Sequence, residues 1–343
     1  MKPAVALANV ALGNVALANF ALAICVLAHG QPAATKDPGY KYARLGKATD
    51  ASPQPSAGYL LAGGGADVDR GIAWFCAKAN GGDLLVLGDA GDNAYNGYIH
   101  RVCPSLNSVA TLVVTGREGA RADFVVQAVR HAEAILIAGG DQAKYVDSWQ
   151  GSPLQDEINA AVARGVPMGG VAAGLNVLSE FVDTAAGGTV TSAQALADPF
   201  DERITLARHF LKIPLLGGTL TDAHFAAQDA MGRDLAFLAR LAAQGWTPEP
   251  RGIFIDDKTA ALIEPDGKVS VLGSGAAYFV RLTKKADDCN PGDPLTLHGA
   301  EVYRASEGGI FDLLRWSGTG GVGYSMSVEN GALKSAQAGG AAY

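Results

Sequence analysis

From Tyr59 onward, the chain alternates short apolar runs with longer segments in which apolar residues recur at helical spacing. The apolar runs, which contain glycine at or near their ends, occupy residues 59–65, 83–89, 109–116, 134–141 and 166–172. The mixed segments between them occupy residues 66–82, 94–105, 118–132 and 156–165. Strands that end in glycine and open directly into a helix are typical of βαβ units. The pattern therefore predicts an α/β fold with a mostly parallel sheet, whose ligand site lies beyond the carboxyl ends of the strands.

The alternation becomes less regular after Glu180. Residues 247–282 predict strands joined by tight turns, and the pair Asp266–Gly267 is a hairpin signal. From about Pro291 the chain is rich in glycine and predicts two or three further short strands. We therefore expect a core domain at residues 56–290 and a β-rich C-terminal extension, residues 291–343, packed on it.

The N-terminal 30 residues predict a secretory signal peptide. Lys2 precedes a long apolar stretch, and small residues stand just before Gln31. We expect cleavage after Gly30 and a secreted or periplasmic mature protein. An uncleaved membrane anchor is the alternative, because the apolar run is long enough to span a bilayer, but its three asparagines argue against it. Residues 31–55 are polar and contain proline, which predicts a linker or an extended lead-in.

Composition and charge exclude some classes of function. The chain has 343 residues, of which 48% are hydrophobic and 18% charged, so a sizeable core can form. Its formal net charge is −7 without a basic stripe, and we expect no nucleic-acid partner. Cys76, Cys103 and Cys289 remain after the signal; Cys76 and Cys103 are the favoured pair for a disulfide, with three free thiols as the alternative. Neither the cysteines nor the histidines show metal-ligand spacing, so we expect no metal and no other cofactor.

The most informative segment is residues 165–181, where an apolar strand runs into small residues and a helix begins at once. Serine hydrolases of α/β type place their nucleophile on such a turn, in the pattern Gly-x-Ser-x-Gly. The glycines allow a sharp turn, and the helix N-terminus and the amide after the nucleophile stabilise the oxyanion. Between Gly170 and Gly174 the central residue of this chain is Ala172. The backbone requirements of the turn are met, but the hydroxyl is missing.

Four segments occur in the order found in the cyanophycinase and dipeptidase E type of serine peptidase: residues 134–146, 165–181, 220–241 and 252–263. In that family the elbow reads Gly-Gly-Thr-Ser-Ala-Gly, and the later segments carry an Asp-x-His-Phe motif and an Ile-Asp-Glu-x-Thr-Ala motif. The chain resembles this family over roughly residues 57–330. The resemblance implies a class I glutamine amidotransferase-like α/β fold with helices on both faces of the sheet. It also implies serine-type hydrolysis of peptide or isopeptide bonds as the inherited chemistry.

The resemblance assigns roles to residues of the expected catalytic site. Ala172 lies at the position of the serine nucleophile, His224 at that of the general base, and Asp257 where the family usually has the glutamate that orients the base. An aspartate can fill that role, as acids do in triads generally. Ala173 is expected to supply an oxyanion amide, together with Gly140.

The expected substrate-binding residues are Gln142, Asp222 and Arg233, and here the chain departs from the family. The family pattern after the histidine resembles His-Phe-x-x-Arg-x-Arg-x-x-Arg, in which the arginines hold a substrate carboxylate. In this chain Gln228 and Ala230 replace two of the arginines, and only Arg233 survives. Glutamine offers a carboxylate one weak donor and alanine none. The joint loss of the serine and two arginines favours natural divergence over a single engineered substitution.

Other hydroxyl groups are poor candidates for the nucleophile. Ser179 stands seven residues after Ala172, about two helical turns away, and Thr191 and Ser192 lie in an expected loop with nothing to place them near His224. Loss of the serine from a triad lowers turnover on the order of a million-fold. We therefore expect essentially no peptidase activity, and whether the chain is an enzyme at all stays open.

Three hypotheses about function follow. The first is an exported pseudoenzyme that binds a peptide or small acidic ligand, or regulates an active relative. The second is an active hydrolase with an unrecognised nucleophile and His224 as base, and the third is an interaction protein whose β-rich extension is the contact surface. No stable membrane span is expected after processing, and a homodimer is compatible with such a scaffold. Cyanophycin itself is not the expected substrate, because the arginines that recognise aspartate are mostly absent.

Overall fold

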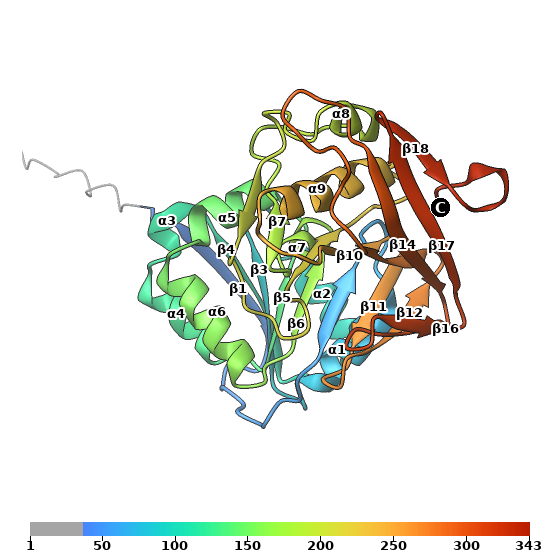
Figure 1. Cartoon of the computed structure of the whole chain (residues 1–343). Helices are drawn as coiled ribbons and strands as arrows, with labels where there is room; N and C mark the ends of the chain where they lie inside the picture. The colour runs from blue at the N-terminus through green and yellow to red at the C-terminus, as the bar shows by residue number, and fades with distance from the viewer. Residues whose placement is uncertain (1–36) are drawn as a thin grey trace, which may run out of the picture. The chain divides into compact units, whose positions relative to one another are not determined.

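Two mixed β-sheets organise the computed structural model, which describes residues 37–343 (Figure 1). The signal peptide expected at residues 1–30 and the start of the expected linker lie outside the described residues. The first sheet has ten strands, in the spatial order β1 (Tyr40–Gly46), β4 (Ser108–Val114), β3 (Asp83–Gly88), β5 (Ala134–Ile137), β6 (Met168–Val171), β2 (Tyr59–Ala62), β11 (Thr259–Ile263), β12 (Lys268–Gly273), β15 (Ile310–Asp312) and β16 (Ser317–Thr319).

The second sheet has eight strands, in the order β18 (Ala332–Ser335), β17 (Val322–Glu329), β14 (Leu297–Ser306), β13 (Ala276–Leu282), β10 (Arg251–Ile255), β9 (Thr219–Asp222), β7 (Phe181–Asp183) and β8 (Leu206–Arg208). The helices are α1 (Asp69–Lys78), α2 (Ala94–Val102), α3 (Gly116–Gly119), α4 (Asp123–Arg130), α5 (Gln142–Trp149), α6 (Pro153–Ala163), α7 (Ala173–Asn176), α8 (Ser192–Ala197) and α9 (Met231–Ala243), with a 3₁₀ turn at Ala338–Gly340. None of the helices within residues 37–343 is long and apolar enough to cross a membrane.

Helices cover both faces of the first sheet, and its central strands are buried at every position. Strands β4, β3, β5, β6 and β2 pair in parallel. Along β3, Leu84 and Val86 pack with α1 and α2 on one face, whereas Leu85 and Leu87 pack with α4, α5 and α6 on the other. Successive strand residues point to opposite faces, so such a continuous apolar run is what a doubly covered strand needs. The α/β fold class predicted from the sequence is confirmed.

The second sheet has its own layer of helices. Phe237 and Leu241 of α9 pack with Phe254 of β10 and Val302 of β14 in a separate apolar cluster. The other face of the same sheet, through residues such as Phe279, joins the main core. The sequence pattern predicts strands in this region but not that they form a second sheet, because pairing between distant strands leaves no local signal.

Two segments differ in part from the expectation. The stretch at residues 31–55, expected as a linker or lead-in, contains strand β1, which pairs antiparallel with β4 at the edge of the first sheet. The region after residue 290 is β-rich, but it does not form a layer of its own. Strand β14 pairs with β13 over seven residues, and β15 pairs with β12, so the extension continues both sheets.

Candidate active site

The turn between β6 and α7 has the backbone of a nucleophile elbow. Ala172 lies between the two elements with φ 50° and ψ −120°, a conformation that residues other than glycine rarely adopt. Such strain costs on the order of 1–3 kcal/mol and persists only where the surrounding structure enforces it. Helix α7 begins at Ala173, whose N–H is the first of the helix and has no partner within it. The expected oxyanion donor therefore stands directly beside Ala172.

Close packing explains the two glycines that flank the turn. A Cβ at Gly170 would lie 2.4 Å from the carbonyl oxygen of Gly174, and one at Gly174 would lie 2.1 Å from that of Ile137. Only glycine fits where two backbones approach so closely. The loop after β5 also reaches the elbow, since a Cβ at Gly139 would lie 3.6 Å from the Cβ of Ala172. Gly140 follows in this loop and lines the same cavity as Ala172.

His224 and Asp257 come from neighbouring parallel strands of the second sheet. His224 follows the carboxyl end of β9 and Asp257 follows that of β10. The Nδ1 atom of His224 lies 2.5 Å from Oδ1 of Asp257, a charge-assisted contact. This contact occupies Nδ1 and leaves Nε2 as the nitrogen able to take a proton, which is the arrangement of a base and its orienting acid.

A glycine loop after β2 holds the histidine in place. His224 itself has a positive φ of 54°, and its N–H donates to the carbonyl oxygen of Gly63. At Gly64, whose φ is +96°, a Cβ would lie 2.3 Å from Cε1 of the His224 ring. Asp256, the neighbour of Asp257, has a structural role: its two oxygens accept from the amides of Ala226 and Ala276.

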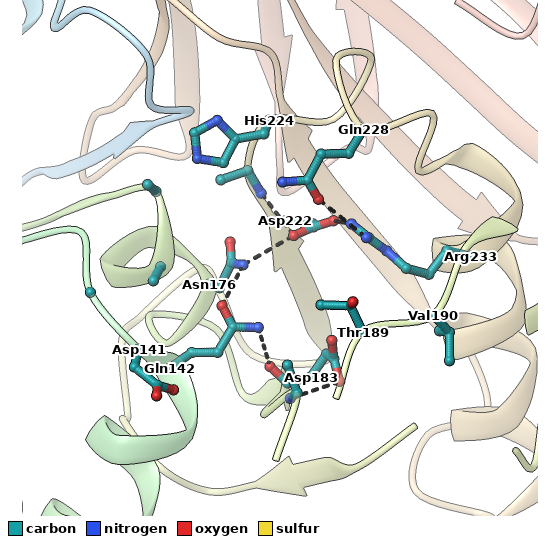
Figure 2. A pocket seen from close by; sticks show the side chains of 15 residues that line it. Asp141, Gln142, Asn176, Asp183, Thr189, Val190, Asp222, His224, Gln228 and Arg233 are labelled. Carbon is teal, nitrogen blue, oxygen red and sulfur yellow. Dashed lines mark hydrogen bonds and ion pairs between the residues drawn. The ribbon is translucent and has the colours of Figure 1, made fainter. Parts of the chain in front are cut away.

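A cavity of about 340 Å³ opens beside the elbow at the carboxyl ends of strands from both sheets (Figure 2). It is lined by Gly140, Asp141, Gln142, Ala172, Ala173, Asn176, Asp183, Ala185, Thr189, Val190, Asp222, Ala223, His224, Gln228 and Arg233. All the site residues expected from the sequence line this cavity except Asp257, which contacts it through His224.

The expected substrate-binding residues form one hydrogen-bonded chain across the cavity (Figure 2). Nε2 of Gln142 donates to the carbonyl oxygen of Asp183 over 2.9 Å. Nδ2 of Asn176 donates to Oε1 of Gln142 and to Oδ1 of Asp222, both over 3.0 Å. Nη2 of Arg233 lies 2.5 Å from Oδ2 of Asp222. Arg233 is thus bound to a carboxylate of the protein itself.

Carboxylates surround Arg233 on more than one side. Its Nε lies 3.5 Å from Oδ1 of Asp234, which is completely buried. Burial raises the pKa of Asp234 well above its usual range, and the charge of Asp222 raises it further. Burial also raises the pKa of Asp183 to about 7; the amide of Ala185 lowers it, Asp222 raises it and Arg233 lowers it. This end of the cavity is therefore crowded with acidic groups that repel one another.

The hydroxyl groups weighed as alternative nucleophiles have structural roles. Ser179 is fully buried, and its Oγ bonds to the carbonyl oxygen of Phe181 and to Oγ1 of Thr221. Thr191 caps helix α8, and Ser192 donates to the carbonyl oxygen of Asp229. Among the residues that line the cavity, Thr189 carries the only hydroxyl, and Figure 2 shows it well away from His224.

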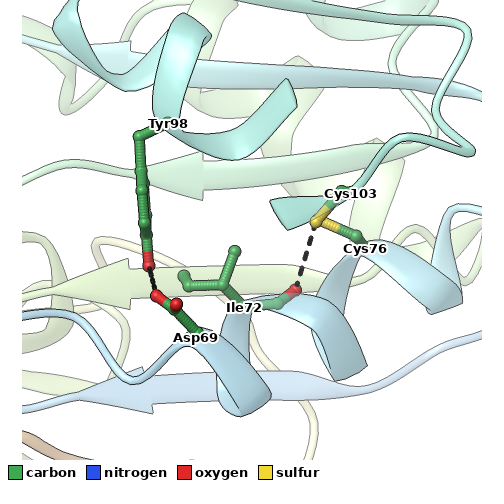
Figure 3. Close-up of a disulfide and its surroundings, with 5 residues drawn as sticks. All are labelled: Asp69, Ile72, Cys76, Tyr98 and Cys103. Atoms are coloured by element: carbon green, nitrogen blue, oxygen red, sulfur yellow. Dashed lines mark hydrogen bonds between the residues drawn. A yellow bond between two sulfur atoms is a disulfide. The ribbon is translucent and has the colours of Figure 1, made fainter. Parts of the chain in front are cut away.

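The favoured disulfide is confirmed. Cys76 of α1 is bonded to Cys103 at the end of α2 (Figure 3), and Cys289 is free. Neither bridged cysteine is available as a nucleophile. Among residues 37–343 there is no group of three or more His, Cys, Asp or Glu side chains that could hold a metal ion.

Sequence reasoning missed several polar residues of the cavity, of which Asn176 and Asp183 contact the expected site residues. Asn176 stands one helical turn after Ala172, so the spacing along α7 could have placed both on one face. Asp183 ends strand β7, and nothing in the local sequence indicates that β7 lies beside β9 in a second sheet. Pairing of distant strands places Asp183 beside Asp222.

Comparisons with known proteins show which families the chain is similar to. Residues 66–199 match the model of peptidase family S51. The chain is 27% identical to a cyanophycinase of Nostoc sp. over 210 residues, which cover 60% of this chain and 65% of that one. It is 26% identical to a cyanophycinase of Synechococcus elongatus over 275 residues, 75% of this chain and 79% of that one. The chain thus matches slightly less than two thirds of the Nostoc protein.

A solved structure supports the fold. The crystal structure of a peptidase from an acI-B1 actinobacterium superposes with a TM-score of 0.51 at 15% identity, covering 76% of this chain and 98% of that one. The chain is thus similar to cyanophycinases and to peptidase family S51.

Proposed function

We propose that this protein is a catalytically silent relative of the S51 peptidases that retains their ligand cavity and binds a peptide or peptide-like ligand there. The observation that carries the proposal is the strained backbone at Ala172, which places a methyl group where the elbow presents a nucleophile. The base and its acid, His224 and Asp257, remain hydrogen-bonded beside it. An alanine methyl group cannot attack a carbonyl carbon, so the inherited acyl transfer stops at its first step.

Restoring the hydroxyl tests this proposal. We expect the A172S variant to react with a fluorophosphonate probe, and the unmodified protein not to react. The double variant A172S/H224A should lose the reaction, because the serine then has no base. Labelling or peptide cleavage by the unmodified protein would refute catalytic silence, and the single variant T189A would then show whether Thr189 takes part. A silent A172S variant would favour the interaction-protein hypothesis.

We also propose that the mature protein is exported. The disulfide between Cys76 and Cys103 supports this, because disulfides persist in oxidising compartments and are rare in the cytosol. N-terminal sequencing of the protein from its host should give a chain that begins at or near Gln31. A chain that still begins at Met1 and fractionates with membranes would instead support the uncleaved anchor.

A further inference from the structure

Asn176 lines the cavity beside Ala172, and its side chain carries a buried oxygen without a partner in the described part of the chain. The side chain is only 8% exposed, and its Oδ1 has no hydrogen-bond partner in the described part of the chain. The orientation of the amide follows from its neighbours: Gln142 donates through Nε2 to a backbone carbonyl, so its Oε1 must accept from Nδ2 of Asn176. The acceptor Oδ1 therefore faces away from both Gln142 and Asp222. A buried acceptor left unpaired is destabilising, and a ligand N–H that reached it would satisfy it.

The charges that line the cavity favour a cation. Asp141, Asp183 and Asp222 contribute three carboxylates, and Arg233 contributes one guanidinium. The formal excess is two negative charges. Lys144 lies 3.7 Å from Asp141 and offsets that carboxylate in part. Asp183 has no cationic side chain within 4.0 Å among residues 37–343, and its one side-chain hydrogen bond is to the amide of Ala185.

Arg233 is poorly placed to bind an anionic ligand. Each of its three nitrogens already contacts a side chain: Nη2 contacts Asp222, Nη1 lies 3.2 Å from Oε1 of Gln228, and Nε contacts Asp234. An incoming carboxylate would have to displace these groups and would meet Asp183 and Asp222 nearby. Like charges at this range in a partly desolvated site are mutually destabilising. The acidic ligand considered from the sequence is thus disfavoured by the charges that surround Arg233.

The geometry points to an alkylammonium subsite in this cavity, with the Asp183 carboxylate as counter-ion and Oδ1 of Asn176 as a further acceptor. This inference rests on the proposed function for the existence of a ligand at the site, and it names the chemical class of that ligand: a peptide or amino-acid derivative with a primary ammonium group. The cavity volume of about 340 Å³ lies at the lower end of the range of about 300–1,000 Å³ for small-molecule sites, which suits one or two residues.

Four amino-acid amides test which ligand charge the cavity prefers, and whether a preferred ammonium group lies on the side chain or at the α-position. Nα-acetyl-lysine amide carries a side-chain ammonium, norleucine amide carries an α-ammonium, Nα-acetyl-norleucine amide is the neutral analogue, and Nα-acetyl-glutamate amide is the anionic one. Calorimetric titration of the unmodified protein at pH 8 should show at least tenfold tighter binding of one of the two ammonium compounds than of the neutral amide. The glutamate derivative should bind weakest.

Two variants test whether the preference for an ammonium group depends on Asp183. D183N removes the charge but keeps an oxygen to accept from Ala185, and it should abolish the preference for the ammonium. D156N changes one exposed carboxylate on α6 by the same charge and should leave the preference intact. Thermal melts of both variants check that they fold.

Three results would overturn the subsite: tightest binding of the glutamate derivative, an unchanged preference in D183N, or no binding of either ammonium compound at 10 mM. These results are separate from the fluorophosphonate test of A172S. Serine labelling in A172S without an ammonium preference would refute only the ammonium subsite. Cleavage by the unmodified protein would refute only the proposal that the protein is catalytically silent.

Discussion

At the scale of single residues, Ala172 has a strained backbone conformation with a φ of 50°. Replacing it with glycine should relieve the positive φ at little loss of packing. We expect A172G to raise the free energy of unfolding by about 1 kcal/mol, measured by urea denaturation. Ala173 is the matched control, since glycine in the first turn of a helix should lower stability. A destabilised A172G would show that the elbow is not under strain.

The role of Asp257 can be measured once a nucleophile is restored. In the A172S background, D257N should slow fluorophosphonate labelling on the order of 10⁴-fold, because an amide at this position would favour the wrong tautomer of His224. D256N is the neighbouring control; it should affect stability more than labelling, since Asp256 bonds to backbone amides of Ala226 and Ala276. Equal labelling in A172S and A172S/D257N would remove Asp257 from the catalytic arrangement.

At the scale of elements, the disulfide ties α1 to the end of α2 on one face of the first sheet (Figure 3). The two cysteines are 27 residues apart, and a loop of this size contributes about 3 kcal/mol by constraining the unfolded chain. We expect reductant, or the C76S/C103S variant, to lower the urea midpoint accordingly. The C289S variant should respond to reductant as the unmodified protein does. Stability that is insensitive to reductant would contradict a structural role of the bridge.

The residues of the candidate active site likewise come from strands that are far apart in the sequence. The elbow comes from the parallel strands of the first sheet, whereas His224 and Asp257 come from the parallel strands β9 and β10 of the second. Loops at the carboxyl ends of both sets meet at the cavity, which agrees with the rule for parallel strands. The glycine loop after β2 completes this arrangement by packing against His224.

At the scale of the whole molecule, buried acids determine how stability depends on pH. Burial raises the pKa of both Glu133 and Asp183 to about 7. In the unfolded chain these groups titrate near 4, so between about pH 4 and pH 7 the folded state binds more protons than the unfolded state. The free energy of unfolding should therefore fall as pH rises through this window and level off above it.

At lower pH, exposed ion pairs have the opposite effect: they make the free energy of unfolding rise with pH. Hydrogen bonds from Arg203 lower the pKa of Asp201 to about 2, and the contact with His298 lowers that of Asp287 to about 2. Their contribution is present above about pH 4 and is lost as pH falls toward 2. We expect the stability maximum near pH 4–5, measured by urea denaturation across pH. The E133Q variant, which retains an oxygen for the amide of Asp83, should show a shallower decline toward pH 8; an unchanged slope would exclude Glu133 as a source.

The sequence by itself determined the α/β class and the elbow with its missing hydroxyl, and it favoured the Cys76–Cys103 pair that the structure confirms. These features depend on local patterns: apolar runs that end in glycine, the five residues around Ala172, and an ordered set of short motifs. The assignment of His224 and Asp257 as partners came from the family resemblance, and their hydrogen bond agrees with it. Such information is carried within a few residues, so it can be extracted without knowing which strands pair.

The charge environment of the cavity was decided only by the tertiary structure. Asp183 and Asp222 end strands β7 and β9, and the sequence does not show that they gather near Arg233 and Asp234 of α9. The partner of Arg233 depends on the packing of α9 against the second sheet, whereas the free oxygen of Asn176 depends on the placement of α7 beside Gln142 and β9. Electrostatic interactions depend on distance and burial in space, neither of which spacing along the chain specifies. For this reason the sequence could identify the arginine that remains but not that the protein already neutralises it.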